Sequence, residues 1–224
     1  MAETKWIDIT LPLGNETPIM PADNASDEEA EMMQPVFDRI FDVEKGDPVN
    51  MVHISIDSHV GTHIDSPFHF IPTGDTIDLM PIDTTVGPAR VIEIKSEHEI
   101  TVDELEPYDI QAGERILFKT KNTPKVYATR IYKGKYVTIA PEAARYLAAK
   151  KIRLVGIDYL TSARANDRED VFAVHLAFLS NGVYIIEGLN MDGVAPGDYE
   201  LVCLPLRLEK CDAAPCRAVI RPLK

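Results

Sequence analysis

Short runs rich in valine and isoleucine recur along the whole chain, and they constrain the fold more than any other feature of the sequence. Most of these runs are bounded by Gly, Pro, Asp or Asn, which is typical of β-strands separated by turns. We therefore expect strands near Trp6–Leu11, Val49–Asp57, Ala89–Lys95, Arg115–Thr120, Tyr136–Ile139, Arg153–Asp158, Val183–Leu189, Leu201–Leu206 and Ala218–Arg221.

Helical signals are fewer, and the clearest covers Pro141–Lys151, with the sequence PEAARYLAAKK. Proline suits the first turn of a helix, Glu142 suits its positive N-terminus, and the two final lysines suit its negative end. Because this helix leads directly into the strand RLVGID, the two form half of a β-α-β unit. A second helix is expected at Val171–Asn181, where Gly182 ends it, and a single helical turn in the segment TVDELEPYD.

The polar, acidic stretches Pro21–Glu31 and Ser162–Asp170 are expected to be surface loops. No internal repeat and no inter-domain linker interrupts the chain of 224 residues. At about 150 residues per domain this length suits one domain. The sequence predicts that residues 1–224 form a single mixed α/β domain.

Charge and hydropathy exclude two classes of partner. The chain has 23 Lys and Arg against 36 Asp and Glu, a net charge of −13, and an anionic surface repels phosphate backbones. We therefore expect no nucleic-acid partner. No run approaches the roughly 18 apolar residues of a membrane-spanning helix, and the start of the chain lacks the pattern of an export signal. No membrane partner is expected.

The three cysteines, Cys203, Cys211 and Cys216, are an odd number in a chain large enough to fold without disulfides. They are expected to be reduced thiols, which places the protein in the cytoplasm. The C-x4-C spacing of the last two lacks a second Cys or His pair nearby, so a structural zinc there is not expected.

One segment, His59 to His69, is dense in potential metal ligands: it holds three of the chain's six histidines and an aspartate. A glycine and a proline inside it argue against a helix. In an extended chain, side chains two positions apart share a face, and His59, His63, Asp65 and His69 are all odd-numbered. Imidazole nitrogens and a carboxylate oxygen are suitable ligands for zinc or manganese.

Two simpler interpretations of this segment compete with a catalytic metal site. A polar loop with unrelated histidines is disfavoured by the density and shared parity of the ligands. A purely structural metal site is usually rich in cysteine, and this segment has none. Outside the segment, His53 in the apolar run MVHISI is expected to be a half-buried strand histidine, and His98 in KSEHEI is expected to be solvated.

His175 and Glu187 stand twelve residues apart in apolar surroundings. A lone histidine on the apolar helix VFAVHLAFLSNG is more often a core residue than a ligand. A carboxylate in the strand VYIIEGL is costly to bury unless it is paired or bound to a metal. Together with the histidine-rich segment, these two residues could complete a two-metal site.

The sequence resembles the cyclase family of metal-dependent amidohydrolases, whose members include kynurenine formamidases and isatin hydrolases. The likeness covers most of the chain, from an early strand ending in Asp8 to the tripeptide EGL with Asp192 after it. It rests above all on the spacing His59-x3-His63-x-Asp65-x3-His69 and on the later histidine and glutamate twelve apart.

The resemblance implies an α/β fold of the swivelling β/β/α type, in which a β-barrel-like sheet is packed by helices. It also implies a homodimer or homotetramer and two divalent ions, zinc or manganese, in each subunit. The resemblance implies that His59, His63 and Asp65 bind the first ion and that Asp65 bridges to the second. It implies that His175 holds the second ion, that Glu187 contacts both ions, and that His69 is the acid/base.

The sequence departs from this family at one place near the N-terminus. Formamidases of the group carry a stretch of the type W/Y-P-G-D that helps to hold an aryl substrate. The matching stretch here is Pro18-Ile-Met20-Pro21-Ala-Asp23. Met20 is expected to contact the substrate, since a methionine can pack on a ring. The change predicts that N-formylkynurenine is a poor substrate relative to a smaller or differently shaped amide.

The sequence as a whole predicts a metal-dependent hydrolase of amide-type bonds in a small-molecule substrate. Divalent metals lower the pKa of water from 15.7 toward about 7 and so supply hydroxide at neutral pH. His69 would shuttle a proton to the leaving nitrogen. Three alternatives remain at this point: a hydrolase of lactams, lactones or other esters on the same site, a non-catalytic metal-binding protein, and a metal-free binding module.

Overall fold

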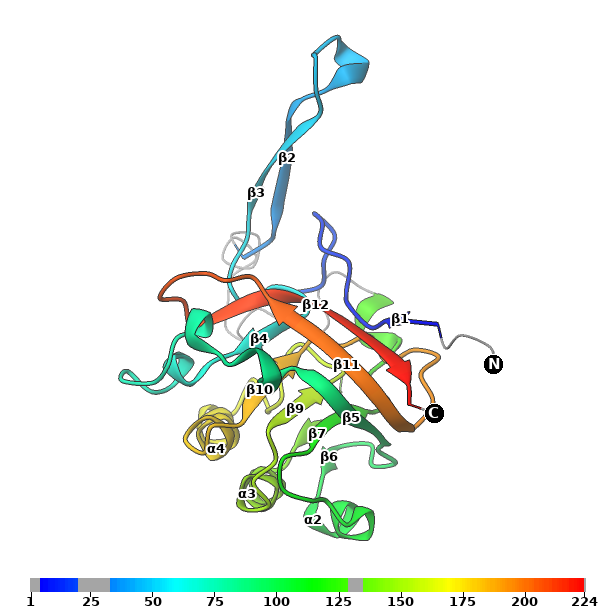
Figure 1. Cartoon of the computed structure of the whole chain (residues 1–224), viewed down its shortest axis with the longest axis vertical. Helices are drawn as coiled ribbons and strands as arrows, with labels where there is room; N and C mark the ends of the chain where they lie inside the picture. The colour runs from blue at the N-terminus through cyan, green and yellow to red at the C-terminus, as the bar shows by residue number, and fades with distance from the viewer. Residues whose placement is uncertain (1–4, 20–32, 129–134, 224) are drawn as a thin grey trace.

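The computed structural model describes residues 5–19, 33–128 and 135–223. Within these ranges one large sheet dominates the molecule (Figure 1). Its strands are β1 (Ile7–Asp8), β4 (His63–Asp65), β5 (Val86–Glu93), β7 (Arg115–Lys119), β9 (Leu154–Ile157), β10 (Tyr184–Glu187), β11 (Gly197–Pro205) and β12 (Ala213–Pro222).

The sheet closes on itself like a barrel. Its order is β1-β12-β11-β5-β7-β9-β10-β4, and β4 also pairs with the start of β12. Strands β5, β7, β9 and β10 run parallel to their neighbours in this series, and the remaining pairings are antiparallel. The closure brings β4, from the first third of the chain, between β10 and β12.

Helices cover the outer face of the parallel strands (Figure 1). They are α2 (Val102–Leu105), α3 (Pro141–Ala149) and α4 (Arg168–Leu179). Helix α3 begins with the predicted proline, and α4 begins after Asp167, whose side chain accepts hydrogen bonds from the amides of Glu169 and Asp170. That cap explains why α4 starts three residues earlier than the predicted Val171.

Alternation along each strand separates two apolar cores. On β7, Ile116 and Phe118 pack against the helices, whereas Leu117 points into the barrel. On β10, Ile185 faces the helices and Ile186 faces the barrel interior. The period of two that defines a strand thus produces a sheet buried on both faces. The predicted mixed α/β architecture, a barrel-like sheet packed by helices, is confirmed.

Two smaller strand pairs lie outside the main sheet. Strands β6 (Glu99–Ile100) and β8 (Thr138–Ile139) form a short parallel pair. Strands β2 (Val36–Phe41) and β3 (Met51–Ser55) form an antiparallel hairpin that projects from the body of the molecule (Figure 1).

Each predicted strand overlaps a strand of the structure, but β2, β4 and β6 were not predicted. Two other expectations are wrong. The stretch Ser162–Asp170 is not a surface loop, because Ser162 and Asp170 are buried and α4 already begins within it. His53 is exposed on β3 instead of half-buried, because the hairpin leaves the body of the protein. The predicted loop Pro21–Glu31 lies outside the described residues.

The expectations for His98 and for the three cysteines agree with the structure. His98 is exposed, as predicted. None of the three cysteines forms a disulfide. Across the described ranges, no helix is both long and apolar enough to cross a membrane.

Candidate metal centre

The centre is built first from two neighbouring strands. In the antiparallel pairing of β10 with β4, Glu187 lies opposite His63, and Ile185 lies opposite Asp65. Because Ile64 points into the barrel, the flanking His63 and Asp65 point outward, on the same face as Glu187. His63 Nε2 lies 3.4 Å from Asp65 Oδ1 and 3.5 Å from Glu187 Oε2. Strand register thus gathers three buried ligand-type side chains on one face.

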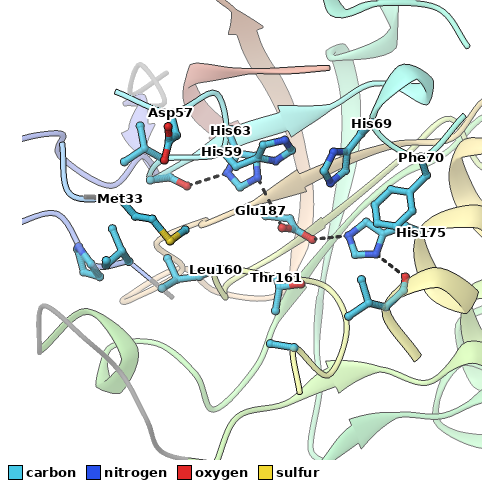
Figure 2. Close-up of a pocket in the computed structure, with 16 residues that line it drawn as sticks. Met33, Asp57, His59, His63, His69, Phe70, Leu160, Thr161, His175 and Glu187 are labelled. Atoms are coloured by element: carbon cyan, nitrogen blue, oxygen red, sulfur yellow. Dashed lines mark hydrogen bonds and ion pairs between the residues drawn. The ribbon is translucent and has the colours of Figure 1, made fainter. Parts of the chain in front are cut away.

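Helix α4 adds His175 from the layer above this face (Figure 2). The Nδ1 atom of His175 lies 2.7 Å from the carbonyl oxygen of Val171, one turn earlier. Since a carbonyl oxygen can only accept, Nδ1 donates to it, and Nε2 is the ring nitrogen that faces the carboxylates. That Nε2 lies 3.4 Å from Glu187 Oε1 and 3.8 Å from Asp65 Oδ2.

A hydrogen bond from Nδ1 to a backbone carbonyl oxygen also orients His63. Its Nδ1 donates to the carbonyl oxygen of Gly61 at 3.0 Å, so its Nε2 faces the carboxylates. Glu187 is held in turn by the backbone amide of Ser162, which donates to Oε1 at 2.5 Å. Backbone groups therefore orient the rings of His63 and His175 and hold one oxygen of Glu187.

His59 and His69 reach the same place by turns of the chain. Only His63–Asp65 is a strand, and His69 ends a short 3-10 helix over Pro67–His69. The prediction of one extended segment is therefore wrong, although its four ligand-type residues do come together. The His59 and His69 ring centroids lie 4.1 Å apart, and His59 Nδ1 lies 3.0 Å from Asp65 Oδ1.

Gly61 permits the turn that precedes β4. Its φ is +63°, in the left-handed region that favours glycine, and a Cβ there would lie 2.4 Å from Leu13 Cδ2. A larger residue at this position would displace either the N-terminal segment or the carbonyl that orients His63.

Asp212, immediately before β12, is a site residue that the sequence did not indicate. Its Oδ2 lies 2.8 Å from His59 Nε2 and 3.2 Å from His69 Nδ1, and its Oδ1 accepts a hydrogen bond from Ser58. The residue stands in the acidic stretch EKCDAAP, more than 140 positions from His69, with no local motif around it. Only the closure of the barrel between β4 and β12 brings it to the centre.

The residues present fit a divalent cation. His63 Nε2 and both carboxylate oxygens of Asp65 are buried and make no hydrogen bond, and such atoms are costly to bury without a partner. Two sets of three donors lie within 4.8 Å of one another: His59, Asp65 and His69 form one, and His63, Asp65 and Glu187 form the other. The nitrogen and oxygen donors in these sets are those that zinc and manganese accept.

The charges of the centre are strongly coupled. Burial alone would lower the pKa of His63, but the carboxylates of Asp65 and Glu187 raise it to about 10. Burial and the Asp65 charge favour a neutral Glu187, yet His175 and His63 lower the pKa of that carboxyl to about 2. The pKa of Asp65 is likewise held well below its usual value, because His59 and His63 outweigh the effect of burial.

His69 differs from the other histidines of the centre. Burial lowers the pKa of His69, and the neighbouring charges do not reverse this. For His59 and His175 burial acts in the same direction, but hydrogen bonds to carboxylates raise the pKa of both. Among these four histidines, the lowered pKa of His69 favours its neutral form, whereas the pKa shifts of the other three favour the protonated form.

A cavity of 320 Å³ opens over the centre, within the range of small-molecule sites. Its walls are partly apolar, and the ring of Phe70 stacks on His175 with centroids 4.6 Å apart. Pro18 and Ile19 also line it. The predicted substrate contact Met20 follows Ile19 directly but lies outside the described residues.

Comparison with known proteins identifies the family of this chain. The family model described as a putative cyclase matches residues 7–163. Kynurenine formamidases from Bacillus cytotoxicus and Bacillus thuringiensis are 35% and 34% identical to the chain, each over 227 residues that cover all of both proteins. The chain therefore belongs to the cyclase family.

Solved structures of related hydrolases have the same fold as this chain. A potential metal-dependent hydrolase with cyclase activity has 34% identity and a TM-score of 0.82, covering 99% of this chain and 100% of its own. An isatin hydrolase bound to thioisatinate has 22% identity and a TM-score of 0.85, covering 99% of this chain and 94% of its own, and it shares the fold. The protein is thus an enzyme of this family, a metal-dependent hydrolase, as the sequence predicted.

Proposed function

We propose that this protein hydrolyses an amide-type bond, with an aryl formamide as the substrate class. The observation that carries the proposal is Asp65, a buried carboxylate that belongs to both sets of donors, next to the cavity that His59, His63, His69 and Glu187 line. The full-length similarity to the Bacillus kynurenine formamidases supports the choice of bond.

We propose that two ions, zinc or manganese, occupy the centre. His59, His63 and Asp65 would hold the first, and Asp65, His175 and Glu187 the second. When bound, the metals would polarise the scissile carbonyl and lower the pKa of water. The Nε2 atoms of His63 and His175, which face the carboxylates, and the 3.0–3.8 Å spacing of the donors support this assignment.

We propose that His69 is the acid/base and not a ligand. The distances alone would allow either role, because His69 lies in a donor set with His59 and Asp65. Its lowered pKa and its hydrogen bond to Asp212 support the first role. With Nδ1–H donated to Asp212, Nε2 of a neutral His69 can take a proton from the attacking water and return it to the leaving nitrogen.

The cavity walls would orient the substrate. Phe70 and Val171 form an apolar side on which a ring can lie, while the carbonyl of the substrate faces His63 and Glu187. Met20 would contact the substrate. Because the aromatic residue of the formamidases is absent, we propose a preference for amides smaller than, or shaped differently from, N-formylkynurenine.

The wider setting completes the proposal. Residues 1–224 would act as one domain, in the cytoplasm, as a homodimer or homotetramer, and with neither nucleic acid nor membrane as partner. Three cysteines without disulfides support the compartment, and the net charge of −13 supports the absence of nucleic acid. For an aryl formamidase the reaction would belong to tryptophan breakdown.

The test is hydrolysis by protein of known metal content. Protein purified anaerobically and analysed for metals is assayed on formyl arylamines, lactams such as isatin, lactones and simple esters. We expect formamide hydrolysis that disappears with a chelator and returns with zinc or manganese. A preference for lactams or esters would select the first alternative. Stoichiometric metal without turnover on any substrate would indicate a metal-binding protein instead.

A further inference from the structure

Asp212 lies at the edge of the metal centre and contacts two of its histidines through one oxygen. Its Oδ2 lies 2.8 Å from Nε2 of His59 and 3.2 Å from Nδ1 of His69. The two rings lie side by side, with centroids 4.1 Å apart, and both line the cavity (Figure 2). The same oxygen therefore touches a proposed ligand of the first ion and the proposed acid/base.

The main chain of Asp212 is fixed by the closure of the barrel. Asp65 lies opposite Ala213 where β4 pairs with β12. The next pair continues this contact, because the carbonyl oxygen of Asp212 accepts hydrogen bonds from the amide of Ser66 at 2.9 Å and from its hydroxyl at 2.7 Å. These bonds use only the backbone of Asp212, so they hold the residue beside Asp65 whatever its side chain is.

The carboxylate of Asp212 is held separately from its main chain. The hydroxyl of Ser58 donates to Oδ1 at 3.0 Å, which leaves Oδ2 for the two rings. The side chain is 35% exposed, less than that of a freely solvated surface residue. Both oxygens are thus engaged, by three side chains that all belong to residues 58–69.

The contact with His59 is on the far side of the ring from the proposed ion. The Nδ1 atom of His59 lies 3.0 Å from Asp65 Oδ1, whereas Nε2 faces Asp212. The imidazole therefore lies between the two carboxylates. Asp212 belongs to neither of the two donor sets of the centre. A carboxylate placed in this way can orient a ligand without binding the ion itself.

We infer that Asp212 is a positioning residue, which orients His59 and His69 together with one oxygen. The inference rests on the roles proposed above for these two histidines. An ionised carboxylate can only accept, so each ring has to donate to it. His59 then donates from Nε2 and directs Nδ1 toward the ion. His69 donates from Nδ1 and keeps Nε2 for proton exchange in the proposed reaction.

A shared oxygen makes two effects depend on one side chain. Carboxylates that hydrogen-bond a metal-binding histidine typically contribute about 10–100-fold to metal affinity or activity. Loss of the Asp212 carboxylate should therefore weaken metal binding through His59 and slow turnover through His69. The two effects can be measured separately, one without substrate and one at saturating metal.

The first test compares Asp212→Ala with Asp212→Asn by chelator competition for zinc. Alanine removes both the charge and the acceptor. Asparagine removes only the charge, because its amide oxygen can face the rings while the Ser58 hydroxyl accepts from its amide nitrogen. Zinc affinity should fall about 10–100-fold in Asp212→Ala. The loss in Asp212→Asn should be at least about threefold smaller, since a neutral acceptor keeps part of the bond.

This pair of variants separates orientation from charge. Equal losses of zinc affinity in Asp212→Ala and Asp212→Asn would mean that only the negative charge matters, and the inference would be wrong. Glu209→Ala, on the same loop with a side chain 80% exposed, is the matched control and should bind zinc like the wild type. Circular dichroism should be alike in all of these proteins, because the main-chain bonds between Asp212 and Ser66 are kept.

A second test needs neither a variant nor a substrate. In zinc-loaded wild type with ¹⁵N-labelled histidine side chains, NMR reports which nitrogen of each ring carries a proton. We expect a proton on Nε2 of His59 and on Nδ1 of His69. A proton on Nδ1 of His59, or on Nε2 alone of His69, would contradict the inference even if every variant failed to fold.

The third test measures turnover at saturating zinc. In Asp212→Ala kcat should fall about 10–100-fold with KM nearly unchanged, because the orientation of His69 matters in proton transfer. In a His69→Asn background the same change should lower zinc affinity as before but should reduce kcat no further. An equal further loss of kcat would refute the effect through His69, and unchanged zinc affinity in Asp212→Ala would refute the effect through His59.

Failure of this inference can be told apart from failure of the proposed function. A wild type that binds zinc but hydrolyses no amide would refute the proposed reaction, and with it the effect through His69, while the affinity and NMR measurements would still decide the effect through His59. A wild type that binds no zinc would refute the metal centre and the role of Asp212 with it. A wild type that binds zinc and hydrolyses formamides, with Asp212→Ala unchanged in both, would refute the role of Asp212 alone.

Discussion

Glu187 lies directly opposite His63 in the pairing of β10 with β4, although the two residues are more than 120 positions apart in the chain. Their side chains share the face toward α4, where His63 Nε2 and Glu187 Oε2 are 3.5 Å apart. The pair is buried, and His175 and His63 lower the pKa of the Glu187 carboxyl despite its burial. Barrel closure therefore determines whether the centre exists at all.

The first prediction concerns Glu187→Gln. The neutral amide removes a ligand charge that is 4% exposed and compensated only by its neighbours. We expect metal content and activity to fall together, measured by elemental analysis and by initial rates on a formamide. Glu142→Gln, at an exposed carboxylate on α3, is the control and should change neither. Retention of both ions and full rate in Glu187→Gln would disprove the two-metal model.

The second prediction compares His63→Asn with His69→Asn. His63 has its Nε2 buried among the carboxylates, so its loss should remove metal and with it all activity. His69→Asn should keep its metal, because the remaining histidines and shared carboxylates hold the ions. Its kcat should still fall by about 10²–10⁴, the usual value of positioned proton transfer, with KM nearly unchanged. The measurement is metal content beside kcat and KM. If His69→Asn loses metal as His63→Asn does, His69 is a ligand.

The third prediction is the pH dependence of stability after metal removal. In the metal-free protein the pKa of His63 is about 10 against 6.5 for the free side chain. Its stabilising contribution is therefore complete below about pH 6.5 and is lost as pH rises toward 10. Metal binding requires deprotonated ligands and so gains strength over the same interval. The Tm difference between metal-loaded and chelated protein should increase from pH 6.5 to 9.

Thermal melts at a series of pH values, with and without chelator, measure this difference directly. His98→Asn, at an exposed histidine far along the chain from the centre, should leave the trend unchanged. A Tm difference that is constant or decreases with pH would show that His63 is not protonated in the metal-free centre.

The ligand types of this site could be predicted from the sequence because they are local and dense. His59, His63, Asp65 and His69 lie within eleven residues, and a buried carboxylate in VYIIEGL needs a compensating charge wherever the strand lies. The geometry could not be predicted in the same way. Gly61 and Pro67 turn the chain on either side of a strand of three residues, so the shared face arises from turns and not from one extended run.

Neither the role of Asp212 nor the β2–β3 hairpin could be predicted from the sequence, for two different reasons. Asp212 acts through contacts across the barrel, and sequence spacing carries no information about such contacts. The strand β2 is exposed at five of its six residues, so its sequence lacks the alternation of buried and exposed positions that indicates a strand. The Gly46-Asp47-Pro48 turn between two apolar runs was the one available signal of a hairpin.

The last prediction concerns substrate preference. Met20 replaces the aromatic residue of the formamidase stretch, and ring-on-ring contact contributes about 0.5–1.5 kcal/mol beyond area burial. Its loss should shift preference by about tenfold at most, without abolishing activity. We therefore expect a lower kcat/KM for N-formylkynurenine than for a smaller formamide, and Met20→Trp should narrow the difference. The measurement is kcat/KM for both substrates with wild type and variant at equal metal content. A kcat/KM for N-formylkynurenine above about 10⁵ M⁻¹s⁻¹ would lie well inside the ordinary range of enzymes. It would show that Met20 does not impair hydrolysis of this substrate and that the aromatic residue is not needed for it.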